Sequence, residues 1–305
     1  MKENQVSSMA LWTTYFRAYH ATHDEPKIFD DFLAWGFFNE EERTSLGQQM
    51  MNIIKAFNPA YTSVFPDQAT ALAWLMQTLA GTPITLSRAK YTEEILEKTV
   101  RQGVRQYVIL GAGMDTFAFR RKELVEQLQI FEIDHPATQD FKRNRITELG
   151  WEIPEQLHFV PVDFTKDSFS EALKRSPYDP QALTFFSWLG VSYYLPQDVV
   201  FAMLKTIAKV SPTGSLVIFD YLDKEAFVPE KAAPRVQGML GFAQQKGEIM
   251  IAGFEPSTLA AELDRLGLRL EEDLSPWDIE VRHFMGRTDF YHACEHAHFA
   301  CAVVK

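Results

Sequence analysis

Two short patterns in the middle of the chain contain residues whose types and spacing fit the binding of a nucleotide-like cofactor. Gly111, Ala112 and Gly113 directly follow the apolar, partly β-branched run 107–110, and a segment that can form a helix comes next. Glycine is favoured where the backbone takes a positive φ, or where a ligand approaches the main chain without meeting a Cβ atom. The pattern predicts a strand, a glycine turn and a helix.

The second pattern is an apolar strand that ends in carboxylates. Residues 129–134 read QIFEID, and His135 and Pro136 follow. A carboxylate roughly 20 positions after a glycine turn lies where doubly wound sheets place an acceptor for ribose hydroxyls. Asp134 is the first candidate for this contact and Glu132 the second. A tight turn with a surface carboxylate is the plain alternative.

The residues after the glycine turn distinguish between cofactors. A dinucleotide fingerprint has a third glycine, because helix and strand pack closely beneath a pyrophosphate, and this chain has Thr116 at that position, after Asp115. An acidic residue at a helix entrance disfavours a pyrophosphate. S-adenosylmethionine has no phosphate, and its sulfonium cation makes acidic groups around the pocket an expected feature.

Four runs of residues carry a resemblance to a known family: GAGMDTFAFR, FEIDHPATQDFKRNRI, VPVDF and FFSWLGVSYYLP. In this order and spacing they resemble the class I S-adenosylmethionine-dependent methyltransferases of the leucine carboxyl methyltransferase type. The bacterial branch, which includes O-methyltransferases of polyketide biosynthesis, is closer still. The resemblance is strong over residues 86–221 and looser at both ends. It implies an α/β fold, a doubly wound, mostly parallel seven-stranded sheet of Rossmann-like topology.

The resemblance also implies roles for residues outside the glycine turn. Arg88 is expected to hold the carboxylate of the cofactor's methionine moiety, for which the planar guanidinium fork is suited, with Arg17 as a weaker second candidate. Asp163 is expected to accept from the adenine amine, and Phe164 to pack on the ring or to offer its backbone amide. The competing roles are a solvated helix arginine for Arg88 and a helix cap for Asp163.

The fourth predicted strand places further residues beside the cofactor. Residues 182–188 are largely apolar, which is typical of a strand buried on both faces, and ligands bind outside the carboxyl ends of such strands. Ser187 and Trp188 are therefore expected to bind the cofactor, together with His135 after the second strand. The family often has Glu after this Trp, whereas this chain has Leu189, which puts one cofactor contact in doubt.

The chain divides into two predicted parts. Residues 1–85 read as helices with apolar positions at three-to-four spacing and form a helical cap. Residues 86–305 form the cofactor-binding domain, with an insertion at about 224–254 that is expected to help enclose the substrate. The helical cap is rich in aromatic residues, which bury large areas and are consistent with two roles, closing a pocket over the cofactor or filling the core. These residues are Trp12, Tyr15, Phe16, Tyr19, Phe29, Phe32, Trp35, Phe37, Phe38, Phe57, Tyr61, Phe65 and Trp74.

Composition argues against several classes of protein. The net charge of −11 over 305 residues does not suit a nucleic-acid surface, and two cysteines are too few for a disulfide framework. No apolar stretch reaches membrane-spanning length, and the N-terminus does not read as a signal peptide. We therefore expect a cytoplasmic protein with a small-molecule substrate; its oligomeric state stays open.

The histidines allow two further interpretations. His292, Cys294, His296 and His298 alternate and would share one face of an extended segment, but neighbours on one strand are poorly placed to surround a metal ion, so no metal site is predicted. A hydroxyl acceptor would be helped by a general base, whereas a carboxylate needs none. The candidates for that base are His20, His23, His135, His283 and His292, and the catalytic residue is left unassigned.

These observations favour an S-adenosylmethionine-dependent O-methyltransferase that acts on a carboxylate or hydroxyl of a small, aromatic or polyketide-like molecule. The alternatives are methylation of a protein carboxyl terminus and binding of the cofactor without turnover. An NAD-dependent oxidoreductase is the least favoured. The chain has no G-x-S-x-G elbow, no H-E-x-x-H motif and no P-loop that would indicate other chemistry.

Overall fold

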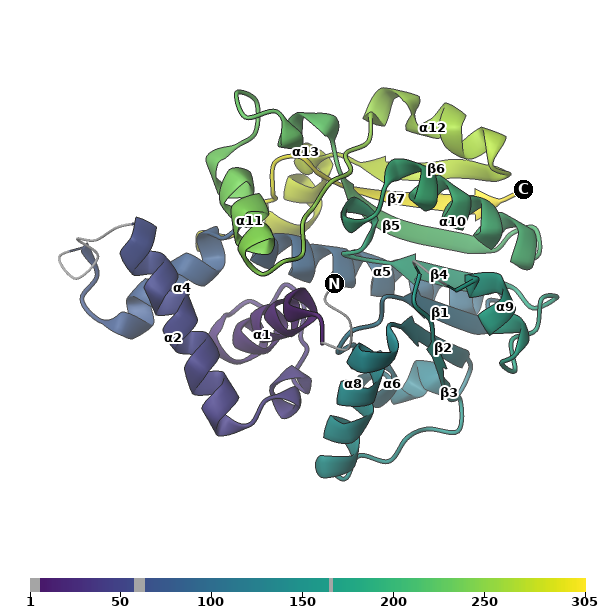
Figure 1. Ribbon diagram of the computed structural model, residues 1–305, viewed down its shortest axis with the longest axis horizontal. Helices are drawn as coiled ribbons and strands as arrows, with labels where there is room; N and C mark the ends of the chain where they lie inside the picture. The colour runs from purple at the N-terminus through teal and green to yellow at the C-terminus, as the bar shows by residue number, and fades with distance from the viewer. Residues whose placement is uncertain (1–5, 58–63, 165–166) are drawn as a thin grey trace.

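The computed structural model describes residues 6–57, 64–164 and 167–305, and within these ranges the chain is built around one seven-stranded sheet (Figure 1). Its order is β3-β2-β1-β4-β5-β7-β6. The first five strands in this order are parallel, and β7 is antiparallel to both β5 and β6. The predicted fold class is thereby confirmed. The strands are β1 (Gln106–Leu110), β2 (Gln129–Asp134), β3 (Leu157–Pro161), β4 (Thr184–Trp188), β5 (Leu216–Leu222), β6 (Leu268–Leu274) and β7 (Ala297–Val304).

Helices cover both faces of the sheet, which explains why every residue of β1 and β4 is buried. One face packs against α5 (Gly81–Arg101), α6 (Phe117–Arg120), α7 (Lys122–Val125) and α13 (Pro276–Ile279). The other packs against α9 (Phe169–Lys174), α10 (Gln197–Val210) and α12 (Pro256–Arg265). Helix α8 (Pro136–Glu148) follows β2, with Pro136 in its first turn.

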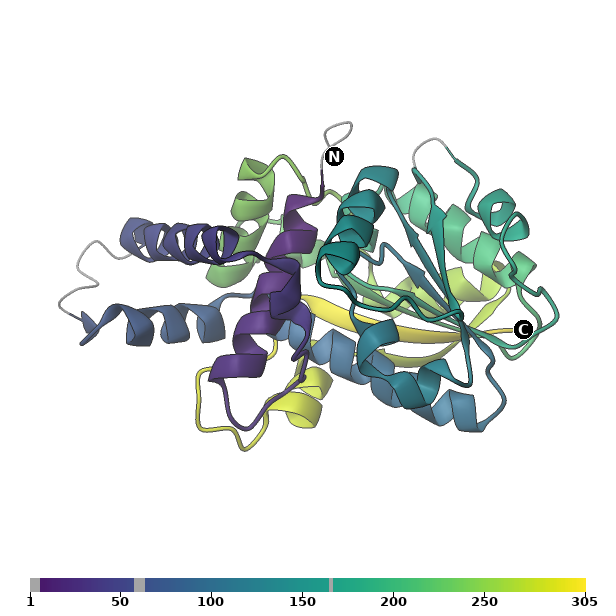
Figure 2. The ribbon, with the colours of Figure 1, turned by 90° about the horizontal axis from the view of Figure 1, so that it is seen from below.

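The N-terminal helices form a layer beside the carboxyl ends of the parallel strands. Helix α1 (Ser8–His23) lies between the sheet and a pair of neighbouring helices, α2 (Glu40–Phe57) and α4 (Gln68–Thr78), which project to one side in both views (Figures 1 and 2). These three helices share a cluster of buried aromatic and apolar side chains. Helix α11 (Pro234–Gln245), in the predicted insertion, packs against α1 through Phe242 and Trp12, whose ring centroids are 5.4 Å apart.

Two sequence-based boundaries differ from the structure. Helix α5 begins at Gly81, because a proline in the first helical turn needs no hydrogen-bond partner for its nitrogen. The expected boundary at residue 85 therefore lies inside a helix. Residues 292–298 are not one extended segment, since β7 begins at Ala297 and His296 has φ +71°. Tyr61 and the side chain of Phe57 lie outside the described part of the chain.

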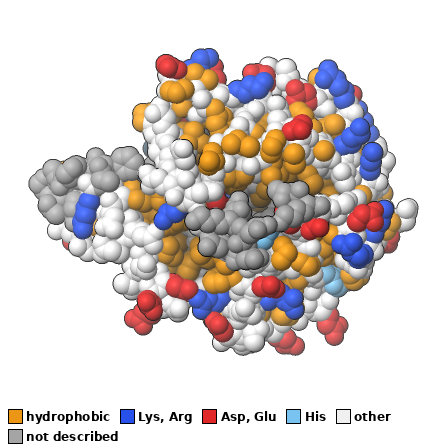
Figure 3. Space-filling view, in the orientation of Figure 1, with side chains coloured by type: hydrophobic (Ala, Val, Ile, Leu, Met, Phe, Trp, Pro, Cys, Tyr) orange, Lys and Arg blue, Asp and Glu red, His pale blue; other side chains and the backbone are white. Residues whose placement is uncertain are grey.

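The molecular surface has a hydrophobic region on the side where the N-terminal helices meet the sheet domain. On the face shown in Figure 3, hydrophobic side chains gather over the middle, and charged side chains lie mostly toward the margins. In the described ranges, no helix is both long and apolar enough to cross a membrane.

Candidate active site

A cavity of about 990 Å³ opens at the carboxyl ends of β1, β2 and β4 and continues between the N-terminal helices and α11. This is the edge of a doubly wound sheet at which ligands bind. The cavity brings together all but one of the residues predicted to bind the cofactor. Those that line it are Arg88, Gly111, Ala112, Gly113, Asp134, His135, Asp163, Phe164 and Ser187.

Trp188 is the exception, because its side chain does not line the cavity. Neighbouring residues of a strand point to opposite faces. Ser187 accordingly lines the cavity, where its hydroxyl lies 3.0 Å from the Tyr107 hydroxyl, whereas Trp188 is fully buried in the core on the other side of the sheet. Leu189 and Gly190, which follow Trp188, also line the cavity at this strand end.

The glycine turn and the acidic strand end are directly bonded to each other. Gly111 has φ +72°, and a Cβ atom there would lie 2.5 Å from Val191 Cγ2, so only glycine fits. The Gly113 amide donates to Asp134 Oδ2 over 2.5 Å, and the His135 amide donates to Asp134 Oδ1 over 2.6 Å. Each carboxylate oxygen keeps a lone pair for a further donor. Burial raises the pKa of Asp134, and the two amide bonds oppose that rise.

Glu132, the second candidate for the ribose contact, has another partner. Its carboxylate is buried against Lys142 Nζ, 2.5 Å away on α8, and the side-chain Nε2 of Gln139 donates to its backbone carbonyl. Burial raises the pKa of Glu132 to about 7, which the lysine opposes. Glu132 does not line the cavity, so of the two carboxylates only Asp134 is in position to contact a ligand.

Arg88 reaches the cavity from α5 and is held there by a carboxylate that the sequence analysis did not single out. Its Nη1 donates to Asp220 Oδ2 over 2.7 Å and to the Tyr193 hydroxyl over 3.0 Å. Asp220 Oδ1 accepts from the Gly190 amide over 2.6 Å. Gly190 has φ +74°, and a Cβ atom there would lie 2.5 Å from Arg88 Nη2. Asp220 had a readable signal, because LVIFD is a further apolar strand with a carboxylate near its end.

Arg17, the second basic candidate, ties α1 to the loop after the glycine turn. Its Nε donates to Asp31 over 2.8 Å, and its Nη2 donates to the Met114 carbonyl over 2.7 Å. Arg17 lines the same cavity as Arg88. Each arginine thus has a carboxylate partner that fixes its guanidinium.

The adenine end predicted from the third strand lies beside α8. Asp163 and Phe164 follow β3 and line the cavity with Val162. Asp163 Oδ2 lies 3.8 Å from His135 Nε2, and the other ring nitrogen of His135 accepts from the Ala137 amide over 3.3 Å as the cap of α8. The residues after β2 and β3 are therefore neighbours, as the parallel register of these strands requires.

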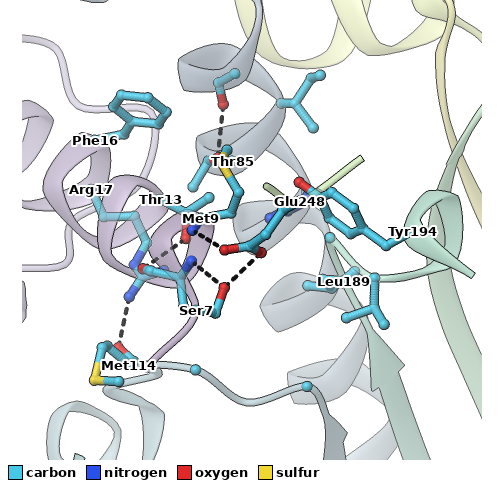
Figure 4. Close-up of a pocket in the computed structure, with 18 of the residues that line it drawn as sticks. Ser7, Met9, Thr13, Phe16, Arg17, Thr85, Met114, Leu189, Tyr194 and Glu248 are labelled. Carbon is cyan, nitrogen blue, oxygen red and sulfur yellow. Dashed lines mark hydrogen bonds between the residues drawn. The ribbon is translucent and has the colours of Figure 1, made fainter. Parts of the chain in front are cut away.

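The start of α1 closes over the cavity through contacts that the sequence did not indicate. Glu248, in the insertion, accepts from the Ser7 hydroxyl over 2.9 Å and from the Met9 amide over 3.1 Å (Figure 4). On the other side, the Ser7 amide donates to the Thr138 hydroxyl of α8 over 3.3 Å. Residues 7–9, which we call the strap, thus bridge the insertion and the sheet domain. Partners so far apart in sequence leave no local pattern.

Most of the histidines that were considered as general bases lie away from the cavity. His20 is fully buried, with Nδ1 2.9 Å from Asp24 and Nε2 accepting from the Ile28 amide over 2.7 Å. Of the five candidate bases, only His135 lines the cavity. No group of three His, Cys, Asp or Glu side chains within the described ranges is arranged to hold a metal ion.

Comparison with known proteins agrees with this architecture. The family model for leucine carboxyl methyltransferase matches residues 10–208. The chain is 39% identical over 313 aligned positions to YktD of Bacillus subtilis (strain 168), described as a candidate S-adenosyl-L-methionine-dependent methyltransferase, with 100% of both chains covered. It is 29% identical over 190 positions, 60% of each chain, to a similarly described protein of Mycobacterium avium (strain 104).

Solved structures show the same fold at low sequence identity. A DUF574 family protein from Streptomyces avermitilis MA-4680 has a TM-score of 0.59 at 10% identity, covering 96% of this chain and 97% of the other. A candidate methyltransferase from Thermobifida fusca YX has a TM-score of 0.50 at 14% identity, covering 73% and 83%. The fold, the cavity and the family match agree: the chain belongs to the leucine carboxyl methyltransferase family of S-adenosylmethionine-dependent methyltransferases. The predicted family and cofactor are confirmed.

Proposed function

We propose that this protein is an S-adenosylmethionine-dependent O-methyltransferase that methylates a carboxylate or hydroxyl of a small, apolar, polyketide-like or aromatic molecule in the cytoplasm. The observation that carries the proposal is the continuity of the cavity. It joins the predicted cofactor residues at the sheet edge to an apolar space beneath the N-terminal helices and α11. Cofactor and acceptor can thus meet in one continuous cavity.

The chain's own residues suit the cofactor. We assign the ribose hydroxyls to Asp134, the adenine to Asp163 and Phe164, and the methionine carboxylate to Arg88. The glycine turn, where the lack of side chains lets a ligand approach the backbone, and the edge residues Ser187 and Leu189 complete the contact. When bound, the cofactor supplies a methyl group on a sulfonium cation, and the chain's contribution is to hold the acceptor oxygen in line with that methyl.

The alternatives differ in what they require of the cavity. A protein carboxyl terminus would have to pass the strap, which Glu248 holds against the insertion. This closure favours a small acceptor. Binding without turnover is the reading that Leu189 supports, and a transfer assay separates it from catalysis.

The first experiment is thermal unfolding with S-adenosylmethionine, S-adenosylhomocysteine or NAD in separate samples. A ligand at 100 times its dissociation constant adds about 2.7 kcal/mol to the free energy of unfolding. We expect a rise in Tm of several degrees with the two adenosyl ligands and none with NAD. A rise with NAD alone would overturn the proposal.

The second experiment is transfer of a labelled methyl group to a panel of carboxylic acids, phenols and alcohols. Product that releases methanol in mild base is a methyl ester and identifies a carboxylate acceptor, whereas a base-stable product is an ether. Binding of both adenosyl ligands without transfer to any acceptor would instead support the non-catalytic alternative.

A further inference from the structure

The part of the cavity farthest from the sheet is apolar, and we call it the apolar arm. Helices α2 and α4 form it and are neighbours in both ribbon views (Figures 1 and 2). Every cavity-lining residue from these two helices is apolar except Thr78, whose hydroxyl donates to the Trp74 and Leu75 carbonyls of its own helix. These lining residues are Met50, Ile53, Ile54, Trp74, Leu75 and Thr78.

The arginines that line the cavity are paired with carboxylates of the protein and do not supply a partner for a polar group in the apolar arm. Each arginine that lines the cavity has a carboxylate partner: Arg17 pairs with Asp31, Arg88 with Asp220, Arg120 with Glu93 and Arg235 with Glu295. A polar or charged group placed in the arm would lose its hydrogen bonds to water and gain none from α2 or α4. The arm therefore suits hydrocarbon.

The shape of the cavity follows one face of α5. The lining residues of this helix recur at intervals of three and four positions: Gly81, Ile84, Thr85, Arg88, Ala89, Thr92 and Glu93. Arg88 lies near Gly190 and the sheet. Gly81 lies seven residues earlier, about 10 Å along the helix axis, where the lining passes to α4. The space is thus elongated and leads away from the cofactor residues.

From this geometry we propose that the acceptor oxygen of the substrate is carried on an elongated, chain-like apolar body of the fatty-acyl type, which lies along α5 with its far end between α2 and α4. The proposal rests on the proposed function, and it narrows the substrate class from small apolar molecules to those with an extended hydrocarbon chain. Flexible methionine side chains, such as Met50, suit a chain that takes several conformations.

The wild-type test measures binding of straight-chain saturated carboxylic acids, from butanoic to tetradecanoic acid, to the protein saturated with S-adenosylhomocysteine. Burial of each added methylene should tighten binding by about fourfold, the equivalent of about 0.8 kcal/mol, until the arm is filled. Affinity that does not change with chain length overturns the proposal. So does tighter binding of benzoic and naphthoic acids than of straight-chain acids with the same number of carbons.

Gly241 of α11 offers a way to add bulk to the cavity from the helix of the insertion. It lines the cavity, and a Cβ atom there would have no heavy atom within 4 Å outside its own helix. In Gly241→Leu we expect the rise in affinity to stop at shorter acids, with binding of S-adenosylhomocysteine unchanged. Gln244→Leu, at an exposed position of the same helix, is the matched control.

A second variant, Ile53→Trp, fills the arm from α2, with Asn52→Trp at the exposed neighbouring position as its control. The proposal is overturned if the dependence of affinity on acid chain length is the same in Gly241→Leu, Ile53→Trp and the wild-type protein. If the variants still bind S-adenosylhomocysteine, the assignment as a methyltransferase is unaffected by that result. If the wild-type protein does not bind S-adenosylhomocysteine, that result instead contradicts the proposed function itself.

Discussion

Among single residues, Asp134 is the one on which binding of the cofactor in the proposed site depends most directly. In Asp134→Asn the side-chain oxygen can still accept from the Gly113 amide, but the negative charge that would face the ribose is lost. We expect affinity for S-adenosylhomocysteine to fall by about 10- to 100-fold, as is typical for a hydrogen bond to a charged group. Calorimetric titration measures this, and the exposed Asp140→Asn on α8 is the control. Unchanged affinity would remove Asp134 from the site.

Asp220 acts on Arg88 and, through the Gly190 amide, on the end of β4. Asp220→Asn leaves the buried Arg88 cation without its counter-charge, so we expect the free energy of unfolding to fall by about 3–5 kcal/mol in urea titrations. The double variant Arg88→Leu with Asp220→Leu should recover much of this loss, because no buried charge remains unpaired.

Measuring the affinity of Asp220→Asn for two adenosyl ligands distinguishes a role of Asp220 in positioning Arg88 from a purely structural role. Asp220→Asn should weaken binding of S-adenosylhomocysteine more than binding of 5′-methylthioadenosine, which lacks the amino-acid moiety assigned to Arg88. Equal losses for both ligands would mean that Asp220 supports only the fold.

At the scale of elements, the π-helix η4 (Glu280–Phe284) after α13 makes stability depend on pH. Neither ring nitrogen of His283 has a hydrogen-bond partner among the described residues, and the side chain is buried. Burial lowers the pKa of His283 to about 4, with Arg282 and Lys90 adding to the effect. In the unfolded chain a histidine titrates near 6.5.

Between about pH 6.5 and 4, His283 is therefore protonated in the unfolded chain but stays neutral in the folded protein. The stabilising contribution of neutral His283 is complete above about pH 6.5 and declines as the pH falls toward 4. We expect the wild-type protein to lose on the order of 2 kcal/mol more than His283→Phe over this window, since other groups titrate alike in both proteins. Urea unfolding at several pH values measures the difference, and parallel pH profiles would contradict it.

The elements that sequence reasoning predicted well are those whose signal is local. Strands β1, β2 and β4 show apolar runs, and the glycine turn and Asp134 lie where fixed spacing puts them. The strap and the Arg88–Asp220 pair could not be predicted, because Glu248 meets Ser7, and Asp220 meets Arg88, across more than a hundred residues. Trp188 lies outside the cavity for a simpler reason. The strand alternation that turns Ser187 toward the cavity turns its neighbour away.

At the scale of the whole molecule, the cap and the sheet domain share a helix and several buried clusters. Helix α5 begins among the N-terminal helices and ends beside β1, and one cluster joins Ile84 of α5, Val236 of α11 and Leu222 of β5. We therefore expect one cooperative unfolding transition rather than an early loss of the N-terminal helices.

Tryptophan fluorescence, to which the buried Trp12 of α1 contributes, should report the same midpoint as far-UV circular dichroism. Saturating S-adenosylhomocysteine should shift both midpoints together. A fluorescence change that precedes the loss of helical signal would show that the N-terminal helices unfold as a separate unit.

The position of the strap has a practical consequence for protein production. Ser7 and Met9 line the cavity, whereas the chain ends at the far side of the sheet domain (Figures 1 and 2). An affinity tag fused ahead of the strap would act on the hydrogen bonds that Ser7 makes to Glu248 and Thr138 beside the cavity. A recombinant form tagged after Lys305 is therefore the one to purify for binding assays and crystallisation.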